Sequence, residues 1–333
     1  MSATRPTVIL GVLLVGAAGP GRADEPTART VPFHNYAQAV ELTLGKSRAV
    51  LCPQAGGRVL SFAVDGADAM YLEDAEKDWR PGKPGPTSAG RFDYGPELTV
   101  RPHPQAWAGE WAAEITRAHT VRLTSPKEDA GIRLVREFRL VPYGKTVGLA
   151  CTQTMTNVSD EVREVCHWGR SFSPAGGICV VPLGDRPSRF PGGYALYEDS
   201  AVINVRARDD HVRERAGFVE VLGPPRKPKL GFDTYAGWLA YAMPNDRVFV
   251  KRFPADPDRV YNEAAGLTLS VWYPPGPRIE LEPIGPRERL KPGESAAFTE
   301  DWWLLSHPFP KAGERLDLKA LAEQVTTQTT QSK

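Results

Sequence analysis

Two glutamates near the end of the chain, Glu280 and Glu282, are spaced so that both side chains share one face of a strand. They alternate with Ile279 and Leu281, and residues two apart in a strand point to the same side of the sheet. Paired carboxylates that line a concave site can act as general bases or bind hydroxyl groups. They can also be ordinary charge on a solvent-facing strand, which the composition alone favours.

A second candidate for proton chemistry is His167, which lies beside Trp168 and Arg170 in a segment with strand-like alternation. An imidazole with an ordinary pKa of about 6.5 can donate or accept a proton near neutrality. The alternative is a structural histidine that is hydrogen-bonded at the end of a strand. For a lone histidine the structural role is the more frequent one.

Two aromatic and polar segments earlier in the chain, residues 90–97 and 100–107, show no clear period. Irregular segments that are rich in side chains often carry sites on a rigid scaffold. Arg91, His103 and Trp107 could contact a ligand there through hydrogen bonds and ring stacking. The simpler alternative is that all three are loop residues.

The usual motifs of cofactor, metal and nucleic-acid sites are missing from the sequence. No phosphate-binding glycine loop is present, the six histidines are scattered without ligand spacing, and no two cysteines form a CxxC pair. Basic and acidic residues are interleaved, with a net charge of +1, which argues against nucleic acid. We therefore expect no metal, no cofactor and no nucleic-acid partner.

Two of the four cysteines, Cys151 and Cys166, lie almost symmetrically about a turn at residues 157–160. A hairpin at this turn would place the two cysteines nearly opposite each other. A disulfide is possible in an oxidising compartment, and two buried free thiols are an equally open alternative.

Glycine and proline are frequent, at 31 residues each, and many short segments alternate polar and apolar residues. We expect about fifteen short antiparallel strands, with no internal repeat and no dividing linker. The clearest strands are residues 39–44, 56–64, 119–124, 132–140, 146–157, 161–172, 218–222, 237–243, 248–253 and 267–273. One helix is expected at 316–324 and a disordered polar tail at 326–333. The pattern predicts an all-β sandwich or barrel.

The first 23 residues have the features of a secretory signal. Arg5 supplies the positive charge, residues 7–18 form an apolar stretch too short to span a bilayer, and Gly21-Arg-Ala23 fits a cleavage site. We expect cleavage after Ala23 and export to the periplasm or the cell exterior, without stable membrane insertion. An uncleaved membrane anchor is the alternative.

Several segments, taken in order, resemble a known group of domains. They are Gly56-Gly-Arg-Val-Leu-Ser-Phe62 with Asp65-Gly66, then Thr156-Asn157 followed by His167-Trp-Gly-Arg-Ser-Phe172, and Glu280 followed by Pro292-Gly-Glu294. This set resembles the galactose mutarotase-like superfamily, which includes aldose 1-epimerases and hexose-6-phosphate epimerases. The resemblance covers roughly residues 35–306.

Within that superfamily the sequence is most similar to a bacterial domain family of unknown function. The similarity rests on Gly90-Arg-Phe-Asp-Tyr-Gly-Pro-Glu97, on Lys229-Leu-Gly-Phe-Asp233 with Gly237-Trp-Leu239, and on Glu280-Leu-Glu with Gly285-Pro286. Each segment alone is a weak signal, and the ordered set is fairly specific.

The resemblance implies a galactose mutarotase-like β-supersandwich of two large antiparallel sheets over residues 30–310, with a concave face that binds a sugar. It implies an epimerase-like mechanism at an anomeric centre, in which a carboxylate takes the proton of the C1 hydroxyl and a histidine protonates the ring oxygen. Mapped onto this sequence, the base is Glu280 and the acid is His167. Further substrate contacts are implied for Arg91, His103, Arg170, Asp233 and Glu282.

The sequence departs from the epimerases at two points. Their Tyr-Phe pair after the histidine is replaced here by Trp168-Gly-Arg-Ser-Phe172, and their Gln-x-x-Pro-Asp segment after the glutamate is absent. The groups that fix the substrate must therefore differ. A carbohydrate-binding protein without turnover, or a structural sandwich of the cell envelope, is the alternative on the same fold.

Overall fold

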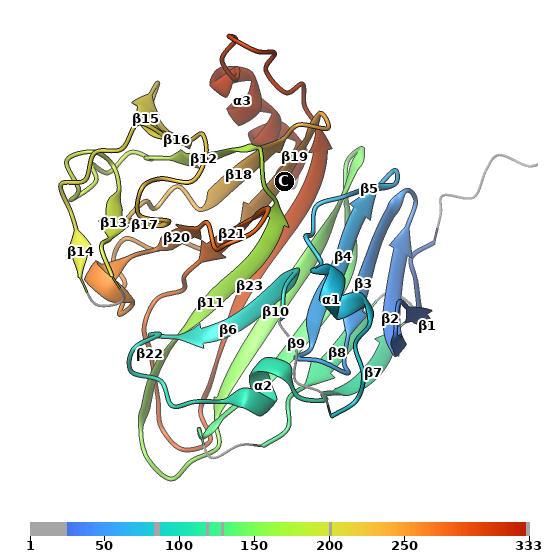
Figure 1. Ribbon diagram of the computed structural model, residues 1–333. Coiled ribbons are helices and arrows are strands. Elements are labelled where there is room, and N and C mark those ends of the chain that lie inside the picture. Colours follow the sequence, from blue (N-terminus) through green and yellow to red (C-terminus); the bar gives the residue numbers. More distant parts are fainter. Residues whose placement is uncertain (1–24, 83–86, 118–119, 128–129, 200–201, 331–333) are drawn as a thin grey trace, which may run out of the picture.

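The computed structural model describes residues 25–82, 87–117, 120–127, 130–199 and 202–330. Two large antiparallel sheets, A and B, pack face to face around a shared core (Figure 1). The all-β sandwich of two large sheets that the sequence predicts is therefore confirmed. The expected signal sequence at 1–23 lies outside the described residues.

Sheet A contains thirteen strands in the described part of the chain. Its main path runs, in spatial order, through β1 (Thr27–Phe33), β2 (Tyr36–Leu44), β3 (Ser47–Cys52), β4 (Arg58–Val64), β6 (Gly90–Gly95), β11 (Arg163–Pro174), β21 (Arg278–Pro283), β20 (Leu269–Trp272), β17 (Lys229–Phe232), β13 (Ala195–Tyr197) and β14 (Ile203–Asn204). Off this path, β5 (Ala67–Asp68) pairs with β4, and β22 (Glu288–Leu290) pairs with β11.

Sheet B contains ten strands, counted over the same described ranges. In spatial order they are β15 (Val212–Arg215), β16 (Phe218–Val221), β12 (Ile178–Pro182), β18 (Trp238–Met243), β19 (Arg247–Arg252), β23 (Ser295–Ser306), β10 (Thr146–Asn157), β9 (Ile132–Tyr143), β8 (Thr120–Thr124) and β7 (Ala112–Arg117). The core between the sheets is filled by large aromatic side chains such as Phe62, Phe92, Phe249 and Trp302, whose rings contact one another.

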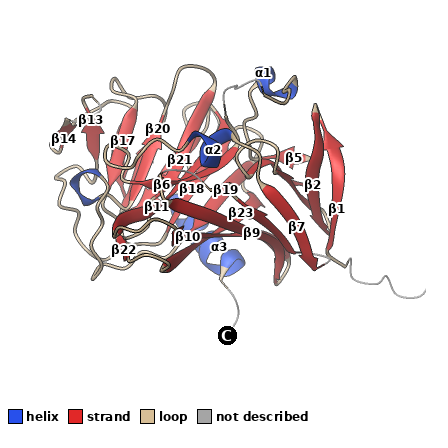
Figure 2. Ribbon diagram, turned by 90° about the horizontal axis from the view of Figure 1, so that it is seen from below, coloured by secondary structure: helices blue, strands red, loops and turns tan. Residues whose placement is uncertain are grey.

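Helices are few and short. They are α1 (Asp74–Lys77), α2 (Pro104–Ala108), a 3-10 turn (Ala264–Gly266) and α3 (Leu318–Thr329). In the described residues, no helix is long and apolar enough to cross a membrane. Figure 2 shows α2 and α3 on opposite sides of the two sheets, with α2 above β6 and β11 and α3 beneath β9 and β10.

Helix α3 closes the outer face of sheet B. Asp317 caps it by accepting a hydrogen bond from the backbone N–H of Ala320 at 3.0 Å. Its buried residues Leu321 and Val325 pack with Trp303 of β23 in a second apolar cluster. The helix runs further than the expected 316–324, so the prediction of a disordered tail is wrong up to Thr329, because the buried face of the helix continues through Val325 to Thr329.

The chain changes sheets between β10 and β11, where the sequence suggests a hairpin. β10 pairs with β9 and β23 in sheet B, whereas β11 pairs with β6 and β21 in sheet A. Cys151 and Cys166 therefore lie in different sheets, and both are buried free thiols. The predicted hairpin is wrong, and free thiols are the alternative that the structure contains.

Most of the expected strands are present within a few residues of their predicted ends. The segment at 90–97 is not among these expected strands, yet it contains β6, in which Arg91-Phe92-Asp93-Tyr94 alternate charged and aromatic residues. All six residues of β6 are buried, on both faces of sheet A. Polar and apolar side chains therefore do not alternate between water and core along this strand.

The packing of α3 gives a stability prediction. Leu321 is fully buried between the helix and sheet B, so Leu321→Ala should lower the free energy of unfolding by about 2 to 5 kcal/mol. Urea denaturation measures this change. The matched control on the exposed side of α3, Lys319→Ala, should change it by less than about 0.5 kcal/mol. Equal losses for both variants would contradict the observed orientation of the helix.

Candidate functional site

Strand β11 sends alternate side chains to opposite faces of sheet A. His167 points into the core between the sheets, whereas Arg170 points to the outer face. In register, Arg170 lies opposite Arg91 of β6, and Phe172 lies opposite Glu280 of β21. Because paired residues in neighbouring strands share a face, Arg91, Arg170 and Glu280 meet on the outer face.

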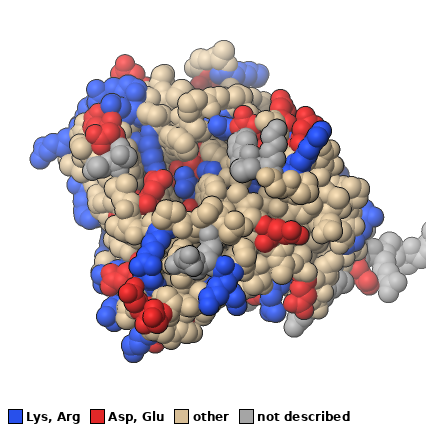
Figure 3. Space-filling model, turned by 60° about the horizontal axis from the view of Figure 1, so that its bottom comes forward, with Lys and Arg blue, Asp and Glu red and all other residues tan. Residues whose placement is uncertain are grey.

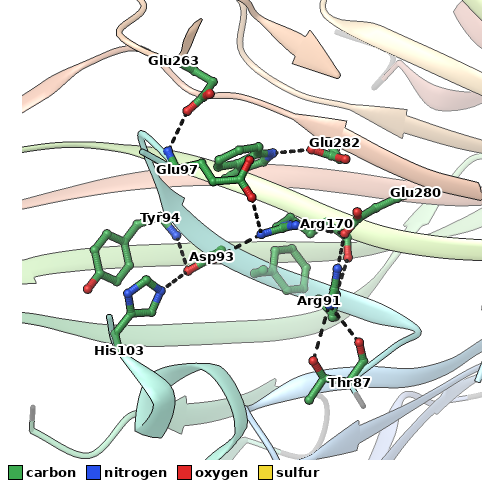
Figure 4. A network of polar contacts seen from close by, with 12 residues as sticks. Thr87, Arg91, Asp93, Tyr94, Glu97, His103, Arg170, Glu263, Glu280 and Glu282 are labelled. Atoms are coloured by element: carbon green, nitrogen blue, oxygen red, sulfur yellow. Dashed lines mark hydrogen bonds and ion pairs between the residues drawn. The ribbon is translucent and has the colours of Figure 1, made fainter. Parts of the chain in front are cut away.

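Glu280 is the centre of an ion cluster on this outer face (Figure 4). Its Oε1 accepts hydrogen bonds from Arg91 Nη2 and, at 3.2 Å, from Arg170 Nε. Burial alone would raise the pKa of this carboxyl, but the two guanidinium groups outweigh burial and hold the pKa of Glu280 below its usual range. An ionised carboxylate that is clamped in this way fixes two arginines and is a weak proton acceptor.

Glu282, on the same face of β21, has the opposite electrostatics. Its Oε2 accepts a hydrogen bond from Trp168 Nε1 at 2.8 Å and lies 3.9 Å from Lys229 Nζ. Burial raises the pKa of Glu282 against the opposing effect of Lys229, and the neighbouring Glu280 raises it further. Its Oε1 has no hydrogen-bond partner in the described residues. The two acids are equivalent in the sequence, but their surroundings shift their pKa values in opposite directions.

An aspartate–histidine pair completes the outer face. Asp93 of β6 accepts a hydrogen bond from His103 Nε2 at 2.7 Å, and His103 Nδ1 lies 2.7 Å from the carbonyl oxygen of Arg101. Both imidazole nitrogens face acceptors, so the geometry fits an imidazolium that donates twice. Burial would raise the pKa of Asp93, but His103, with a smaller effect of Arg170, lowers it.

A shallow open pocket of about 360 Å³ lies beside this pair. We call it the site pocket, and it is lined by Asp93, Pro102, His103, Pro104, Trp107 and Arg170. The ring of Trp107 in α2 stacks near two guanidinium groups, with Arg91 4.5 Å and Arg170 5.1 Å from its centre. The pocket therefore combines one aromatic face with groups that can donate and accept hydrogen bonds.

The two glutamates lie beneath this pocket and do not line it. Their side chains are 0% exposed, whereas Asp93, His103 and Arg170 are 10 to 12% exposed. The interpretation of Glu280 and Glu282 as solvent-facing charge is therefore wrong, because cationic and aromatic side chains cover both carboxylates. A ligand in the site pocket meets Asp93, His103 and Arg170 first.

His167 does not face Glu280, so the predicted acid–base pair across one pocket is not present. The imidazole is 1% exposed and lies between the sheets. Its Nε2 is 2.7 Å from Glu300 Oε1 on β23, and its ring stacks on Phe298. The correction follows from strand geometry: His167 and Arg170 are three residues apart in β11 and must point to opposite faces.

The partners of His167 define its protonation. Gln153 Oε1 accepts from Arg136 Nε at 2.8 Å, so the amide Nε2 of Gln153 faces His167 Nδ1, at 3.1 Å. Nδ1 must therefore accept and Nε2–H must donate to Glu300, which describes a neutral imidazole. Lys251 Nζ lies 2.9 Å from the other carboxylate oxygen of Glu300 and supplies its countercharge.

Asp233, like His167, lies away from both the ion cluster and the site pocket. Its carboxylate accepts hydrogen bonds from the hydroxyl of Ser188 at 2.5 Å and from the backbone N–H of Arg189 at 2.8 Å. The side chain is buried, and it holds the loop that precedes β13. The structure therefore gives Asp233 a loop-anchoring position. Arg91, His103, Arg170, Glu280 and Glu282 are brought together as expected.

Three residues of the cluster were not predicted from the sequence. Asp93 alternates with Phe92 and shares a face of the strand with Arg91, which is the signal in the sequence that could have placed it at the site. Lys229 and Trp168 lie in segments that carry the family resemblance, but the sequence alone indicates no role for them. Lys229 binds Glu97 Oε2 at 3.0 Å and lies over the ring of Trp168, a contact that depends on strands far apart in the sequence.

The described residues include no group of three or more His, Cys, Asp and Glu side chains that could hold a metal ion. No protein-family profile matches the chain. No curated protein matches it in sequence.

Solved structures do match, and they show the fold. A galactose mutarotase-like protein from Lactobacillus casei superposes with a TM-score of 0.55 at 11% identity, over 80% of this chain and 100% of that one. A galactose mutarotase related enzyme from Lactobacillus acidophilus gives 0.53 at 10% identity, over 82% and 100%. A galactose mutarotase-like protein from Clostridium acetobutylicum gives 0.51 at 11% identity, over 85% and 99%. The chain therefore has the galactose mutarotase-like fold that its sequence segments resemble.

The buried His167 makes stability depend on pH. Burial lowers the pKa of His167 although Glu300 favours its charged form. In the unfolded chain histidine has a pKa of about 6.5. The unfolded chain therefore binds more protons than the folded one. Stability from this group is complete above that pH and is lost as pH falls toward the folded pKa. In urea denaturation, His167→Gln should flatten the decline of unfolding free energy below about pH 6.5.

The control for this experiment is His34→Gln, because His34 is exposed. This variant should keep the pH dependence of the wild type. Identical pH profiles for wild type and His167→Gln would contradict the neutral, buried imidazole.

Proposed function

We propose that this protein is carbohydrate-active and binds a saccharide in the site pocket. The observation that carries the proposal is the lining of the pocket. Trp107 offers a ring face, and Asp93, His103 and Arg170 offer donors and acceptors at its edge. A concave site with an apolar surface and a few fixed polar groups suits a ring that carries hydroxyl groups.

Two further observations support the same proposal. The fold is shared with proteins that are named after galactose mutarotase, which favours a sugar as the class of ligand. The apolar segment at 7–18, with Arg5 before it, supports export to the periplasm or the cell exterior.

The charges of the site favour an uncharged saccharide over a sugar phosphate. Each cation of the cluster already has a carboxylate partner: Arg170 lies 3.2 Å from Glu280, Lys229 3.0 Å from Glu97 and His103 2.7 Å from Asp93. A phosphate would have to displace one of these pairs. Figure 3 likewise shows basic and acidic side chains interspersed over the face in view, without a field of one sign.

Anomeric acid–base catalysis is the second candidate function, with a changed set of residues. One observation favours it: His103 and Asp93 form a hydrogen-bonded pair at the pocket, and the doubly donating imidazole of His103 can give up a proton. His103 then takes the role of acid that the family resemblance implies for His167. Glu282, although its pKa is raised, lies beneath the cluster and does not line the pocket, so the carboxylate that a ligand there meets is that of Asp93.

Saccharide binding can be measured by calorimetry with a panel of neutral hexoses, hexosamines and disaccharides beside glucose 6-phosphate and galactose 6-phosphate. We expect at least one neutral sugar to bind, and Trp107→Ala to weaken its binding about tenfold, or about 1.4 kcal/mol, through loss of the stacking face. The matched control is Trp238→Ala, since Trp238 packs on Phe218 in sheet B, and it should leave the affinity unchanged. Tighter binding of the 6-phosphates, or equal binding to both tryptophan variants, would contradict the proposal.

Catalysis is separated from binding by NMR measurement of anomeric exchange in the sugar that binds. If the protein turns its ligand over, His103→Gln should reduce the exchange rate about a hundredfold or more, the usual contribution of a general acid or base. His167→Gln should retain the rate when assayed at a pH at which it is folded. Exchange no faster than in buffer for the wild type would establish binding without turnover, and loss of exchange only in His167→Gln would refute the changed assignment.

A further inference from the structure

Strand β6 carries Arg91 and Asp93. One of its two edges is paired with a neighbouring strand along its whole length, and the other edge is paired along only a small part. It pairs with β11 over its whole length, but with β4 only at Val59 and Gly90. Beyond Gly90, no described strand continues the ladder on the β4 side. A buried strand edge needs other partners for its backbone groups, and side chains of sheet B act as further hydrogen-bond partners of β6.

Arg136 of β9 is the first of these partners. Its Nη2 donates to the carbonyl oxygen of Phe92 in β6 at 2.7 Å, and its Nη1 donates to the carbonyl oxygens of Gly56 and Gly57 at 2.6 and 3.0 Å. The guanidinium group therefore bridges the opening between β6 and the turn before β4. The guanidinium carbon of Arg136 lies over the ring of Trp111, 4.3 Å from the ring centre.

The turn at Gly56 and Gly57 in turn supports α2. The backbone N–H of Gly56 donates to the carbonyl oxygen of Gly109 at 2.8 Å, and Gly56 has a φ of +79°. A Cβ at this position would collide with the carbonyl oxygen of Trp107. The turn and the helix segment that carries Trp107 therefore touch backbone to backbone, so the position of one fixes the other.

Gln153 of β10 is the second partner of β6. Its Nε2 donates to the carbonyl oxygen of Asp93 at 2.7 Å, and its Oε1 accepts from Arg136 Nε at 2.8 Å. Two linked side chains from sheet B thus hold consecutive carbonyl groups of β6. On the other face of β6, Asp93 binds His103.

We propose that Arg136 and Gln153 are positioning residues of the site pocket: from behind sheet A they hold β6, with Asp93, and the α2 segment, with His103 and Trp107, at a fixed separation. Neither side chain reaches the pocket. The inference rests on the proposed function only in assuming that the pocket binds a ligand. The positioning of β6 and α2 can be tested without a ligand.

The energetics of Arg136 support this role. It is 2% exposed, and among the described residues its guanidinium group donates to three backbone carbonyls and one side-chain amide, all neutral. Burial lowers the pKa of Arg136 to about 9, with Asp93 opposing the shift. A buried cation without a carboxylate partner is costly. What only the guanidinium fork provides here is simultaneous contact with β6 and with the turn that supports α2.

The test uses the full chain with Arg136→Lys, which keeps a cation but loses the fork, and with Gln153→Leu as a second variant should the first not fold. The control is Leu140→Ala, a buried residue on β9 that faces the same core. Temperatures are chosen so that all variants have the same free energy of unfolding. Two quantities are then compared: hydrogen exchange of peptides that span β6 and α2, and the carboxyl titration of Asp93 by carbon-13 NMR.

Relative to the control, the positioning variants should exchange about tenfold faster in β6 and α2, with other strands unchanged. The pKa of Asp93, which His103 holds below its ordinary value against burial, should rise by about one unit as the contact loosens. Equal exchange and an equal Asp93 titration in the variants and the control would overturn the proposal, because Arg136 and Gln153 would then contribute stability alone. If the saccharide panel fails while these shifts are observed, the proposed function falls and the positioning role stands.

Discussion

The alternation of side chains along β11 is the constraint on which the rest of the structure depends. One face of this strand gives Arg170 to the outer cluster, and the other gives His167 to the core. Both faces are buried, so neither can be solvated freely. The outer face is therefore filled by paired charges around Glu280, and the inner face by a neutral imidazole with Glu300 and Lys251. A shift of one residue in the register of β11 would exchange the two sets.

The two polar layers have different consequences for function. Between the sheets, each charge is bound to groups of the neighbouring sheet, which fixes strands but leaves no access for a ligand. On the outer face, the ion pairs of Glu280 and Glu282 form a floor, and the site pocket opens above it between β6 and α2. The chemistry available to a ligand is therefore that of Asp93, His103 and Trp107, with Arg170 at the boundary between floor and pocket. This arrangement favours binding of an uncharged hydroxylated ring.

The sequence supports the fold better than the roles within the site. The common face of Glu280 and Glu282 follows from their spacing and is confirmed, whereas their burial depends on Arg170 and Lys229, which reach them from other strands. The face of β11 on which His167 lies could not be predicted from the sequence. Alternation shows which residues share a face of a strand, but it does not identify the outer face when both faces are buried. In β6 the alternation of Arg91 and Asp93 with Phe92 and Tyr94 is visible in the sequence, but four residues between two glycines are a weak signal for a strand. The hairpin predicted around residues 157–160 failed because a change of sheet and a turn within one sheet have the same local sequence signals.

The central claim is that ligand chemistry occurs on the outer face of β11 and not around His167. It is tested most directly by following the indole N–H signals of nitrogen-15-labelled tryptophan while the saccharide that binds is titrated in. The signal of Trp107 should move with ligand concentration, and that of Trp302, which donates to Glu300 beside His167, should stay in place. Movement of the Trp302 signal with a stationary Trp107 would contradict the account.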